Sequence, residues 1–449
     1  MSENLKGAYQ GAEKHLKGDL VKLASLPHIL TFLKEIDSEG LLLLLDQARK
    51  IKKRKNQKFP PINADFYDIQ ALLPEEDRKL LAQVREFMLK EVEPIANEYW
   101  GKAEFPFQII NGLKKLNISG LTLDKSVGGQ ERSYLLEGMI GEEIARTDTS
   151  VCTFWGVHCG LAMNSIDLCG SDEQRQKFLP AMIAMDKIGA FGLTEPDVGS
   201  AASMGLKTTC RRNGDTWTIN GQKKWIGNAT FADYIILWAK DEDDHQVKGF
   251  ILDRETPGLT TEKIEHKLSL RTVQNALITL KDCKVTEERR LQKANSFKDT
   301  AVVLRKTRAG VAWQAVGCAK GAYENTLAYT MKREQFGRAI AGFQMTQDML
   351  AQMLSQLTAM QCMVVRLSQL QDLGKISDEQ ASLAKILCTV NCRQITSMSR
   401  ELMGGNGILL SNNVGRFLAD AEALYSYEGT KQINSLVVGR AITGMSAFT

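Results

Sequence analysis

One carboxylate, Glu428, has a sequence setting in which it could act as a general base. It lies in the segment Tyr427-Glu428-Gly429-Thr430, between two stretches of helical periodicity, and so belongs to a connection. Carboxylates on connections are usually solvated, and that alternative stays open. Because the sequence shows no nucleophile elbow and no Ser-His-Asp set, a lone carboxylate base that works with an external cofactor is the simplest catalytic hypothesis.

Two further segments could place a ligand beside such a base. Residues 191–200 combine two hydroxyl side chains with a glycine that lets a ligand approach the main chain, which is typical of an anion-binding or ring-edge loop. A plain surface turn would explain Pro196 and Gly199 equally well. Residues 225–228 place Trp225 beside a glycine at the end of an expected strand, where the indole could cover a planar cofactor or simply pack between sheet and helix.

The glycine run at residues 404–407 is a third candidate for ligand binding. It follows a helical stretch rather than a strand, so it lacks the context of a dinucleotide fingerprint or a P-loop. A helix C-terminal cap is the structural alternative. Both interpretations can hold together, because closely approaching backbone amides also bind phosphate.

No metal site is expected from the nine cysteines, which lack the short paired spacings of a zinc site or a disulfide scaffold. Cys388 and Cys392 lie four apart on an expected helix with no histidine nearby, so buried packing is predicted for both. An odd number of scattered cysteines fits a reducing compartment, and we expect a cytoplasmic protein. Peroxisome and mitochondrion stay open, although neither a peroxisomal tripeptide nor an Arg-rich transit peptide is evident.

Composition and charge exclude some partners. A net charge of +4 spread over 449 residues gives no reason to expect a nucleic-acid partner. The longest pure leucine stretch runs from Leu41 to Leu45 and ends at Asp46, far short of the roughly 18 apolar residues that cross a bilayer. We therefore expect no membrane span.

The distribution of charged, apolar and β-favouring residues along the chain predicts an N-terminal extension followed by three folded parts. Residues 1–61 form a charged extension and linker whose basic run between residues 49 and 58 is expected to be a solvated surface, with contact to acidic lipid or nucleic acid as the alternative. Residues 62–188 are helical, with apolar residues at three- and four-residue steps after Pro74: Leu80, Leu81, Val84, Phe87 and Met88.

Residues 189–296 change to short β-rich runs, and residues 297–449 return to helices. Asn213-Gly214 and Asn220-Gly221 are turn signals that should separate the runs of a small antiparallel sheet. One apolar stripe at helical spacing predicts the core of a helical bundle: Met345, Met349, Met353, Leu354, Leu357, Met360 and Val364.

Taken in order, five segments resemble the signatures of the acyl-CoA dehydrogenase family: residues 191–200, 225–228, 333–337, 403–407 and 427–430. The resemblance covers residues 62–449 and is strongest to the glutaryl-CoA dehydrogenase branch and its short-chain acyl-CoA oxidases. It implies a mainly α fold with a central β domain: an N-terminal helical domain, a middle antiparallel β domain and a C-terminal four-helix bundle. It also implies a homotetramer with FAD held between subunits.

The resemblance assigns site residues by position. Residues expected to line the flavin half of FAD are Phe191, Leu193, Thr194, Ser200, Trp225, Ile226, Gly227 and Thr430. Residues expected to contact the adenine and pyrophosphate half of FAD bound by a neighbouring subunit are Arg333, Gln335, Phe336, Gln344, Glu401, Leu402, Met403, Gly404 and Gly405. Arginine suits pyrophosphate because its guanidinium offers a fork of donors.

Arg308 is expected to anchor the CoA part of a thioester, and Ser200 and Gly429 to contact the substrate. In the family, hydrogen bonds to the thioester carbonyl from the flavin ribityl hydroxyl and the backbone N–H of the catalytic glutamate stabilise enolate-like charge. By this resemblance Glu428 removes the α-proton while the β-hydrogen leaves as hydride to flavin N5, which gives a trans-2-enoyl-CoA.

One departure bears on the substrate. Glutaryl-CoA dehydrogenases carry an arginine followed by serine for the distal carboxylate, whereas this sequence has Cys152-Thr153. A neutral thiol cannot pair with that anion, so an uncharged acyl chain is predicted. The neighbouring Phe154 and Trp155 suggest a short chain.

Two alternatives stay open. An acyl-CoA oxidase would share the first half-reaction and then pass electrons to dioxygen with formation of hydrogen peroxide, whereas a dehydrogenase would pass them to an electron-transfer flavoprotein. A family member that has lost turnover and acts in binding or assembly is the second alternative.

Overall fold

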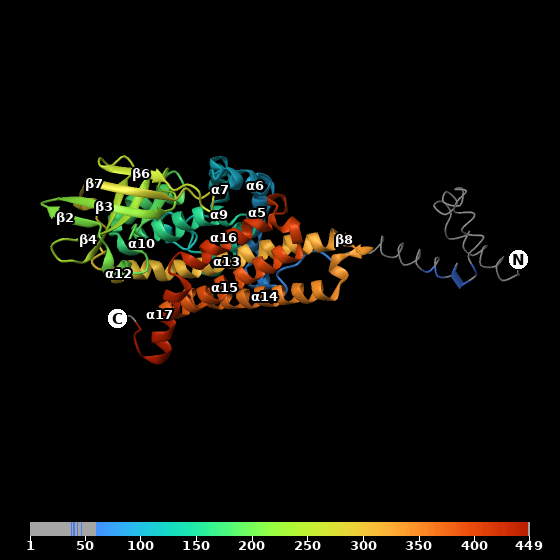
Figure 1. Cartoon of the computed structure of the whole chain (residues 1–449). Helices are drawn as coiled ribbons and strands as arrows, with labels where there is room; N and C mark the ends of the chain where they lie inside the picture. Colours follow the sequence, from blue (N-terminus) through green and yellow to red (C-terminus); the bar gives the residue numbers. More distant parts are fainter. Residues whose placement is uncertain (1–36, 38, 41–42, 44–45, 47–59, 448–449) are drawn as a thin grey trace. The chain divides into compact units, whose positions relative to one another are not determined.

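The computed structural model describes residues 37, 39, 40, 43, 46 and 60–447 (Figure 1). The basic run between residues 49 and 58 lies outside the described residues. The chain divides into two compact units, Met1–Pro61 and Ile62–Thr449, and the second carries all the motifs above. No helix in the described part of the chain is long and apolar enough to cross a membrane.

The N-terminal part of this second unit is helical, as predicted. Helix α5 follows Pro74, has three acidic residues in its first turn, and buries Leu81 and Val84, with Met88 just beyond its end. Two π-helical turns, η2 (Met88–Val92) and η5 (Gly156–Met163), continue α5 and α9. The helices are α5 (Glu75–Phe87), α6 (Glu93–Lys102), α7 (Ile110–Leu116), α8 (Tyr134–Thr147), α9 (Thr149–Trp155), α10 (Asn164–Cys169) and α11 (Asp172–Ile183).

The middle part is a seven-stranded sheet in the order β1-β4-β2-β3-β7-β6, with β5 paired to β4. Its strands are β1 (Gly189–Gly192), β2 (Thr209–Asn213), β3 (Thr216–Ile226), β4 (Tyr234–Asp241), β5 (Val247–Asp253), β6 (Leu259–Lys263) and β7 (Ala276–Thr286), and one short helix, α12 (Ala202–Gly205), follows β1. The short β-rich runs predicted within residues 189–296 lie in β3, β4, β5 and β7.

The sheet is mixed, which corrects the expectation of a purely antiparallel one. β4 runs parallel to both β1 and β2, while the other pairs are antiparallel. Tight turns impose antiparallel pairing only on neighbouring strands, and β1 reaches β4 through a long crossover that contains β2 and β3.

The two Asn-Gly pairs have different outcomes. Asn213-Gly214 turns the chain between β2 and β3, as predicted. The turn predicted at Asn220-Gly221 is wrong, because this pair lies inside β3 at an irregularity in its register with β7. A Cβ on Gly221 would stand 2.6 Å from Thr208, so glycine here permits a close approach of two backbones.

The C-terminal part is a bundle of long helices. Its helices are α13 (Phe297–Lys332), α14 (Gln344–Asp372), α15 (Asp378–Leu402), α16 (Val414–Ser426) and α17 (Lys431–Thr443), and a small hairpin of β8 (Glu334–Gln335) and β9 (Arg338–Ala339) joins α13 to α14. Met353, Leu357, Met360 and Val364 are buried as predicted, whereas Met345 at the start of α14 is 82% exposed. Cys388 and Cys392 are fully buried in the apolar core, as predicted.

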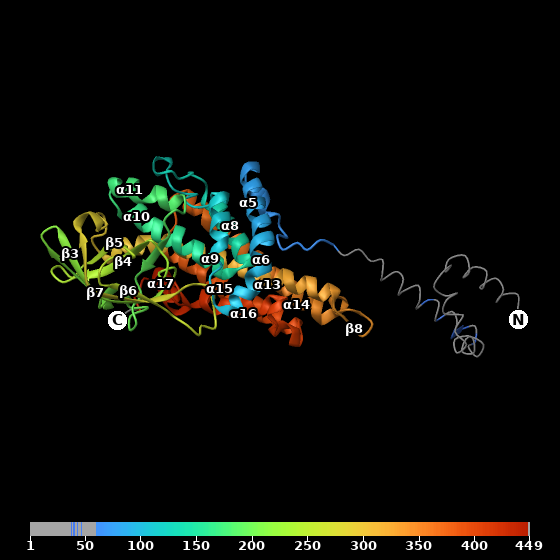
Figure 2. The same ribbon diagram turned by 90° about the horizontal axis from the view of Figure 1, so that it is seen from above.

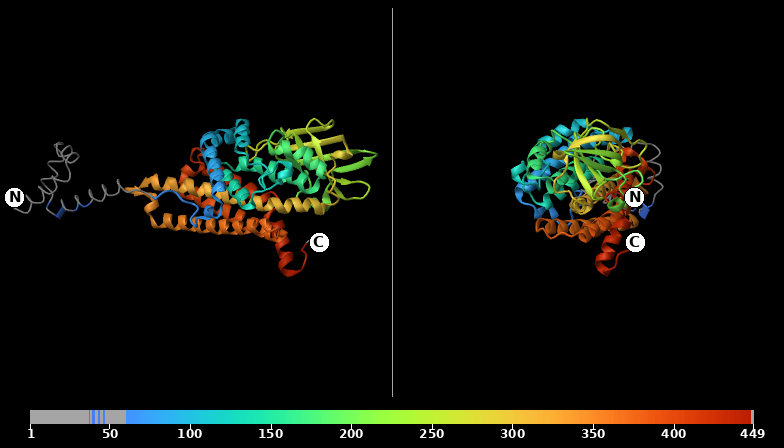
Figure 3. Two further views of the ribbon diagram at one scale, coloured as in Figure 1. Left: turned by 180° about the vertical axis from the view of Figure 1, so that it is seen from behind. Right: turned by 90° about the vertical axis from the view of Figure 1, so that its left-hand side faces the viewer.

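The sheet and the hairpin lie at opposite ends of the long helices (Figures 1 and 2). Seen from behind, α13 runs from the sheet end toward β8 (Figure 3, left). The side chains that pack the helical layers together, among them Trp313 and Phe417, belong to one large apolar core that also takes in one face of the sheet through Ile236 and Trp238. This core fixes the helices that border the site at the sheet end.

Candidate active site

A cavity of about 890 Å³ lies where α8, α9, α13 and the loop before α17 meet β1 and the end of β3. Every residue predicted for the flavin ring, the thioester or catalysis borders it: Cys152, Thr153, Phe191, Leu193, Thr194, Ser200, Trp225, Ile226, Gly227, Arg308, Glu428, Gly429 and Thr430. Five segments that are far apart in sequence thus contribute to one space.

The residues predicted for the adenine half of FAD do not border this cavity. Arg333, Gln335, Phe336 and Gln344 lie on or beside the hairpin, where Phe336 is 94% exposed. Residues 401–405 end α15 and begin the 3-10 turn η8 (Gly404–Ile408), and Gly404 has φ 55°. The expected helix-end glycine is therefore present, and Gly404 and Gly405 are both exposed.

Glu428 is held in the left-handed backbone region. The loop between α16 and α17 gives it φ 52°, and Gly429 follows with φ 90°. A non-glycine residue in this region is unfavourable and persists only where its surroundings fix it. The hydroxyl of Thr430 accepts a hydrogen bond from Ile433 N at 3.3 Å and caps α17, so the helix begins directly after the strained pair.

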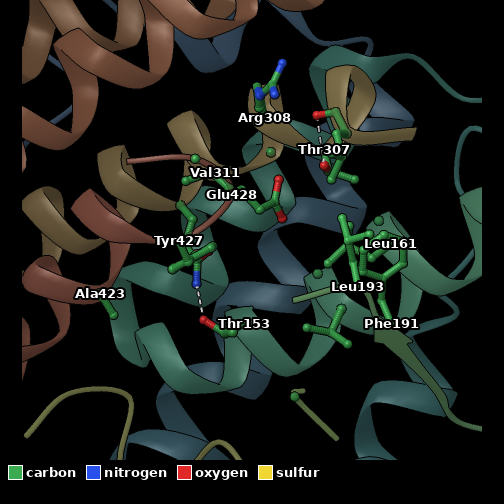
Figure 4. Close-up of a pocket in the computed structure, with 18 of the residues that line it drawn as sticks. Thr153, Leu161, Phe191, Leu193, Thr307, Arg308, Val311, Ala423, Tyr427 and Glu428 are labelled. Carbon is green, nitrogen blue, oxygen red and sulfur yellow. Dashed lines mark hydrogen bonds between the residues drawn. The ribbon is translucent and has the colours of Figure 1, made fainter. Parts of the chain in front are cut away.

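The carboxylate of Glu428 points into the cavity, across from Leu161, Leu193 and Phe191 (Figure 4). Its Oε2 is buried and has no hydrogen-bond partner among the described residues. Burial raises the pKa of Glu428, while the Thr307 hydroxyl and the charges of Lys385 and Arg308 oppose that rise. The result is a carboxylate of increased basicity with one oxygen free to take a proton.

Lys385, on α15, is a residue of the site that the sequence did not reveal. It is 1% exposed, and its ammonium group donates a hydrogen bond to the backbone oxygen of Gly429 at 2.5 Å. Asn434 Nδ2 donates to the same oxygen at 2.8 Å. Burial lowers the pKa of Lys385 to about 8. A lysine on the apolar face between Ala381 and Cys388 was the available signal.

The loop after β1, which is predicted to line the flavin, is held by a second buried lysine. Lys223, in β3, is fully buried and donates to the backbone oxygen of Leu193 at 3.0 Å and to Glu195 Oε1 at 2.8 Å. Lys224 N donates to the backbone oxygen of Thr194 at 2.8 Å. The loop that carries Leu193 and Thr194 is thus fixed to β3 on both sides.

Trp225 ends β3 with φ 68° and borders the cavity while 53% of it is exposed. An indole that simply filled the interface between sheet and helix would be buried. An uncovered aromatic side chain in the same cavity as Phe191 and Leu193 suits a planar ring system such as a flavin.

The part of the cavity bordered by Cys152 and Thr153, which are predicted to contact the substrate, has a neutral, hydrogen-bonded wall. Gln314 donates to Thr153 Oγ1 at 2.6 Å and accepts from the Tyr427 hydroxyl. The Cys152 thiol contacts the backbone oxygen of Gly141 at 3.3 Å, and burial raises its pKa far above the usual range, so it is uncharged. Among the described residues there is no cluster that could hold a metal ion.

Phe154 gives no support for a short acyl chain. It does not border the cavity and packs against Phe105, with ring centroids 4.7 Å apart. Trp155 does border the cavity, and its indole N–H donates to the backbone oxygen of Ile118 at 3.3 Å. Arg308 lies beside Glu428 and has a buried Nε without a hydrogen-bond partner among the described residues.

Family models match most of the folded chain. The acyl-CoA dehydrogenase N-terminal domain matches residues 74–186, the middle domain residues 190–283, and the C-terminal domain residues 297–443.

Curated relatives and solved structures agree with these matches. A subunit of the caffeyl-CoA reductase-Etf complex of Acetobacterium woodii is 32% identical over 81% of this chain and 97% of its own length. The 3-(aryl)acrylate reductase of Clostridium sporogenes is 33% identical over 81% of this chain and 97% of its own length. Glutaryl-CoA dehydrogenase of Mycobacterium smegmatis, in its complex with FADH2, is 32% identical with TM-score 0.83 and covers 86% of this chain and 99% of its own.

Proposed function

The chain belongs to the acyl-CoA dehydrogenase family of oxidoreductases, and we propose that it converts an acyl-CoA with an uncharged acyl end to a trans-2-enoyl-CoA. The observation that carries this proposal is the position of Glu428. Its buried Oε2, which has no hydrogen-bond partner in the part of the chain that the structure describes, belongs to a residue that borders the same cavity as the aromatic and loop residues that suit a flavin.

FAD is the cofactor of this family. The residues of the cavity suit its ring system, because the aromatic Trp225 and the loop of Leu193 and Thr194 both border the cavity. When bound, FAD supplies an acceptor for the hydride that leaves the β-carbon.

The residues of this chain perform the proton transfer. Glu428 must be ionised to accept the α-proton, and the charges of Lys385 and Arg308 favour that form although burial opposes it. The left-handed conformation of Glu428 and the bonds that Lys385 and Asn434 make to Gly429 fix the loop before the substrate arrives. By the family resemblance, the backbone N–H of Glu428 would donate to the thioester carbonyl and stabilise the charge that develops there.

The neutral state of Cys152 supports an acyl group without a distal carboxylate, because a thiol offers no charge to pair with one. We propose no limit on chain length, since Phe154 lies outside the cavity.

We further propose that two copies of the chain build one FAD site and that the enzyme is a homotetramer. The exposed hairpin with Arg333, Gln335 and Phe336 supports this proposal, because its predicted contacts to the adenine half of FAD have no counterpart in the cavity of the same copy. An electron-transfer flavoprotein is the proposed electron acceptor, since one relative is a subunit of a complex with Etf.

Anaerobic titration of the purified flavoprotein with acyl-CoAs tests the reaction. Uncharged acyl-CoAs should bleach the flavin, and glutaryl-CoA should bleach it more slowly at equal concentration. Faster bleaching by glutaryl-CoA would contradict the substrate proposal. Formation of hydrogen peroxide in air at the rate of substrate turnover would favour an oxidase over transfer to an electron-transfer flavoprotein.

A further inference from the structure

The cavity is widened by glycines from three helical segments. Gly156 and Gly160 lie in η5, Gly310 lies in α13, and Gly141 lies in α8, and all four border the cavity. A Cβ on Gly156 or Gly310 would have no atom within 4 Å, and one on Gly160 would stand 3.7 Å from Thr307. Small residues at these positions leave room for an acyl group beyond the carbons next to the thioester.

A second carboxylate, Glu137 on α8, borders the same cavity. Its Oε1 accepts one long hydrogen bond, at 3.5 Å, from the Thr122 hydroxyl, and its Oε2 has no hydrogen-bond partner among residues 60–447. Glu137 is half-buried where it borders the cavity, and this burial raises its pKa. The thiol of Cys159, next to Gly160, is electrostatically coupled to it.

A cation, Lys306 on α13, faces this carboxylate. Lys306 also borders the cavity, lowers the pKa of Glu137 by its charge, and lies over the ring of Tyr134 at 5.2 Å. Within residues 60–447 its ammonium group makes no ion pair at 4.0 Å or less. One acceptor and one donor that are not paired with each other thus border the same part of the cavity.

We propose that Glu137 and Lys306 select acyl groups that carry a hydroxyl distal to the thioester. A hydroxyl both donates and accepts, so it can satisfy the carboxylate and the ammonium together. A distal carboxylate would pair with Lys306 but be repelled by Glu137, and a distal amine would meet the reverse, so neither satisfies both groups as a hydroxyl does. An unsubstituted chain would displace water from both groups and leave them unpaired, which is unfavourable.

The inference rests on the proposed dehydrogenation, and pairs of thioesters separate the two. Hexanoyl-CoA is compared with 6-hydroxyhexanoyl-CoA, and 3-phenylpropanoyl-CoA with 3-(4-hydroxyphenyl)propanoyl-CoA, by kcat/KM and by anaerobic bleaching. In at least one pair the hydroxylated thioester should react with a kcat/KM about tenfold higher. The two pairs show whether the hydroxyl is aliphatic or aromatic.

Substitutions of Glu137 test whether this residue causes the preference for the hydroxylated thioester. Glu137→Leu should bring the ratio within the pair close to one, and Glu137→Gln should keep part of it, because an amide oxygen still accepts. Glu131→Gln, at an exposed position before α8, is the matched control and should leave the ratio unchanged. Ratios near one in both wild-type pairs, or a preference that persists in Glu137→Leu, would overturn the inference, whereas bleaching by the plain thioesters would still support the dehydrogenase. Failure of every thioester to bleach the flavin would overturn the proposed function itself.

Discussion

The sheet end and the hairpin end of the long helices present their predicted FAD residues in different ways. At the sheet end, residues from β1, β3, α13 and the loop before α17 border one cavity and are fixed by buried bonds within the same chain. At the hairpin end, Arg333, Gln335 and Phe336 are exposed. The difference is the one expected from the proposed shared site, in which one chain builds the half that does chemistry and a second copy completes the other half.

The largest effect is expected at the sheet end from Glu428→Gln. An amide of the same shape cannot accept the α-proton, so kcat should fall by about 10³-fold or more while thioester binding persists. Stopped-flow bleaching and a spectral binding titration measure the two effects. The control Glu98→Gln removes an exposed carboxylate in α6 that does not border the cavity, and it should retain turnover. Bleaching of Glu428→Gln at the wild-type rate would contradict the assigned role.

The second effect concerns stability at the same end. Lys223→Met leaves Glu195 buried without its cation, which should lower the free energy of unfolding by about 3 kcal/mol. Thermal unfolding of the flavin-free protein measures it. Lys207→Met is the control, because its ion pair to Asp197 in the same loop is exposed and should contribute less than about 1 kcal/mol. Equal losses in the two variants would refute the idea that Lys223 fixes this loop.

A pH profile tests Lys385. Because the charge of Lys385 lowers the pKa of Glu428, Lys385→Met should raise that pKa further and move the acidic limb of the kcat/KM profile to higher pH. Loss of the bond to Gly429 should also reduce kcat about tenfold. Lys385→Arg, which keeps the charge, should leave the acidic limb near its wild-type position. A limb that does not move in Lys385→Met would show that the lysine acts through packing alone.

The smallest effect is expected at the hairpin end. Arg333→Gln should weaken FAD affinity about tenfold through loss of charged hydrogen bonds to pyrophosphate from a neighbouring copy. Fluorescence of released flavin measures this, and release should increase on dilution because the site needs two copies. Arg338→Gln, which removes an arginine stacked on Phe343 in the same hairpin, is the control. Flavin release that does not depend on protein concentration would argue against a shared site.

Much of the fold and of the cavity at the sheet end could be predicted from the sequence, because both depend on local patterns of residues. Apolar spacing located α5 and the core of α14, and Trp225 lies at the end of β3 as expected. The ordered motifs brought the sheet-end residues together correctly around one cavity. The assigned roles of the individual site residues remain predictions.

What the sequence did not reveal depends on contacts between distant segments. Lys223 bonds to Glu195 28 positions away, and Lys385 bonds to Gly429 44 positions away, so neither bond could be predicted from the local sequence. Gly221 is of a residue type common in turns, yet it lies within a continuous strand, where it is close to Thr208. Glu137 lies in an ordinary helical pattern, and only the packing of α8 places it at the cavity.

Anaerobic mixing of the flavoprotein with an acyl-CoA deuterated at its α-carbon tests the central role of Glu428 most directly. The account predicts that the flavin of the wild-type protein bleaches, that deuterium slows bleaching several-fold, and that Glu428→Gln binds the thioester without bleaching. Bleaching in Glu428→Gln with an unchanged isotope effect, or a colourless wild-type protein that retains no flavin after reconstitution, would contradict it.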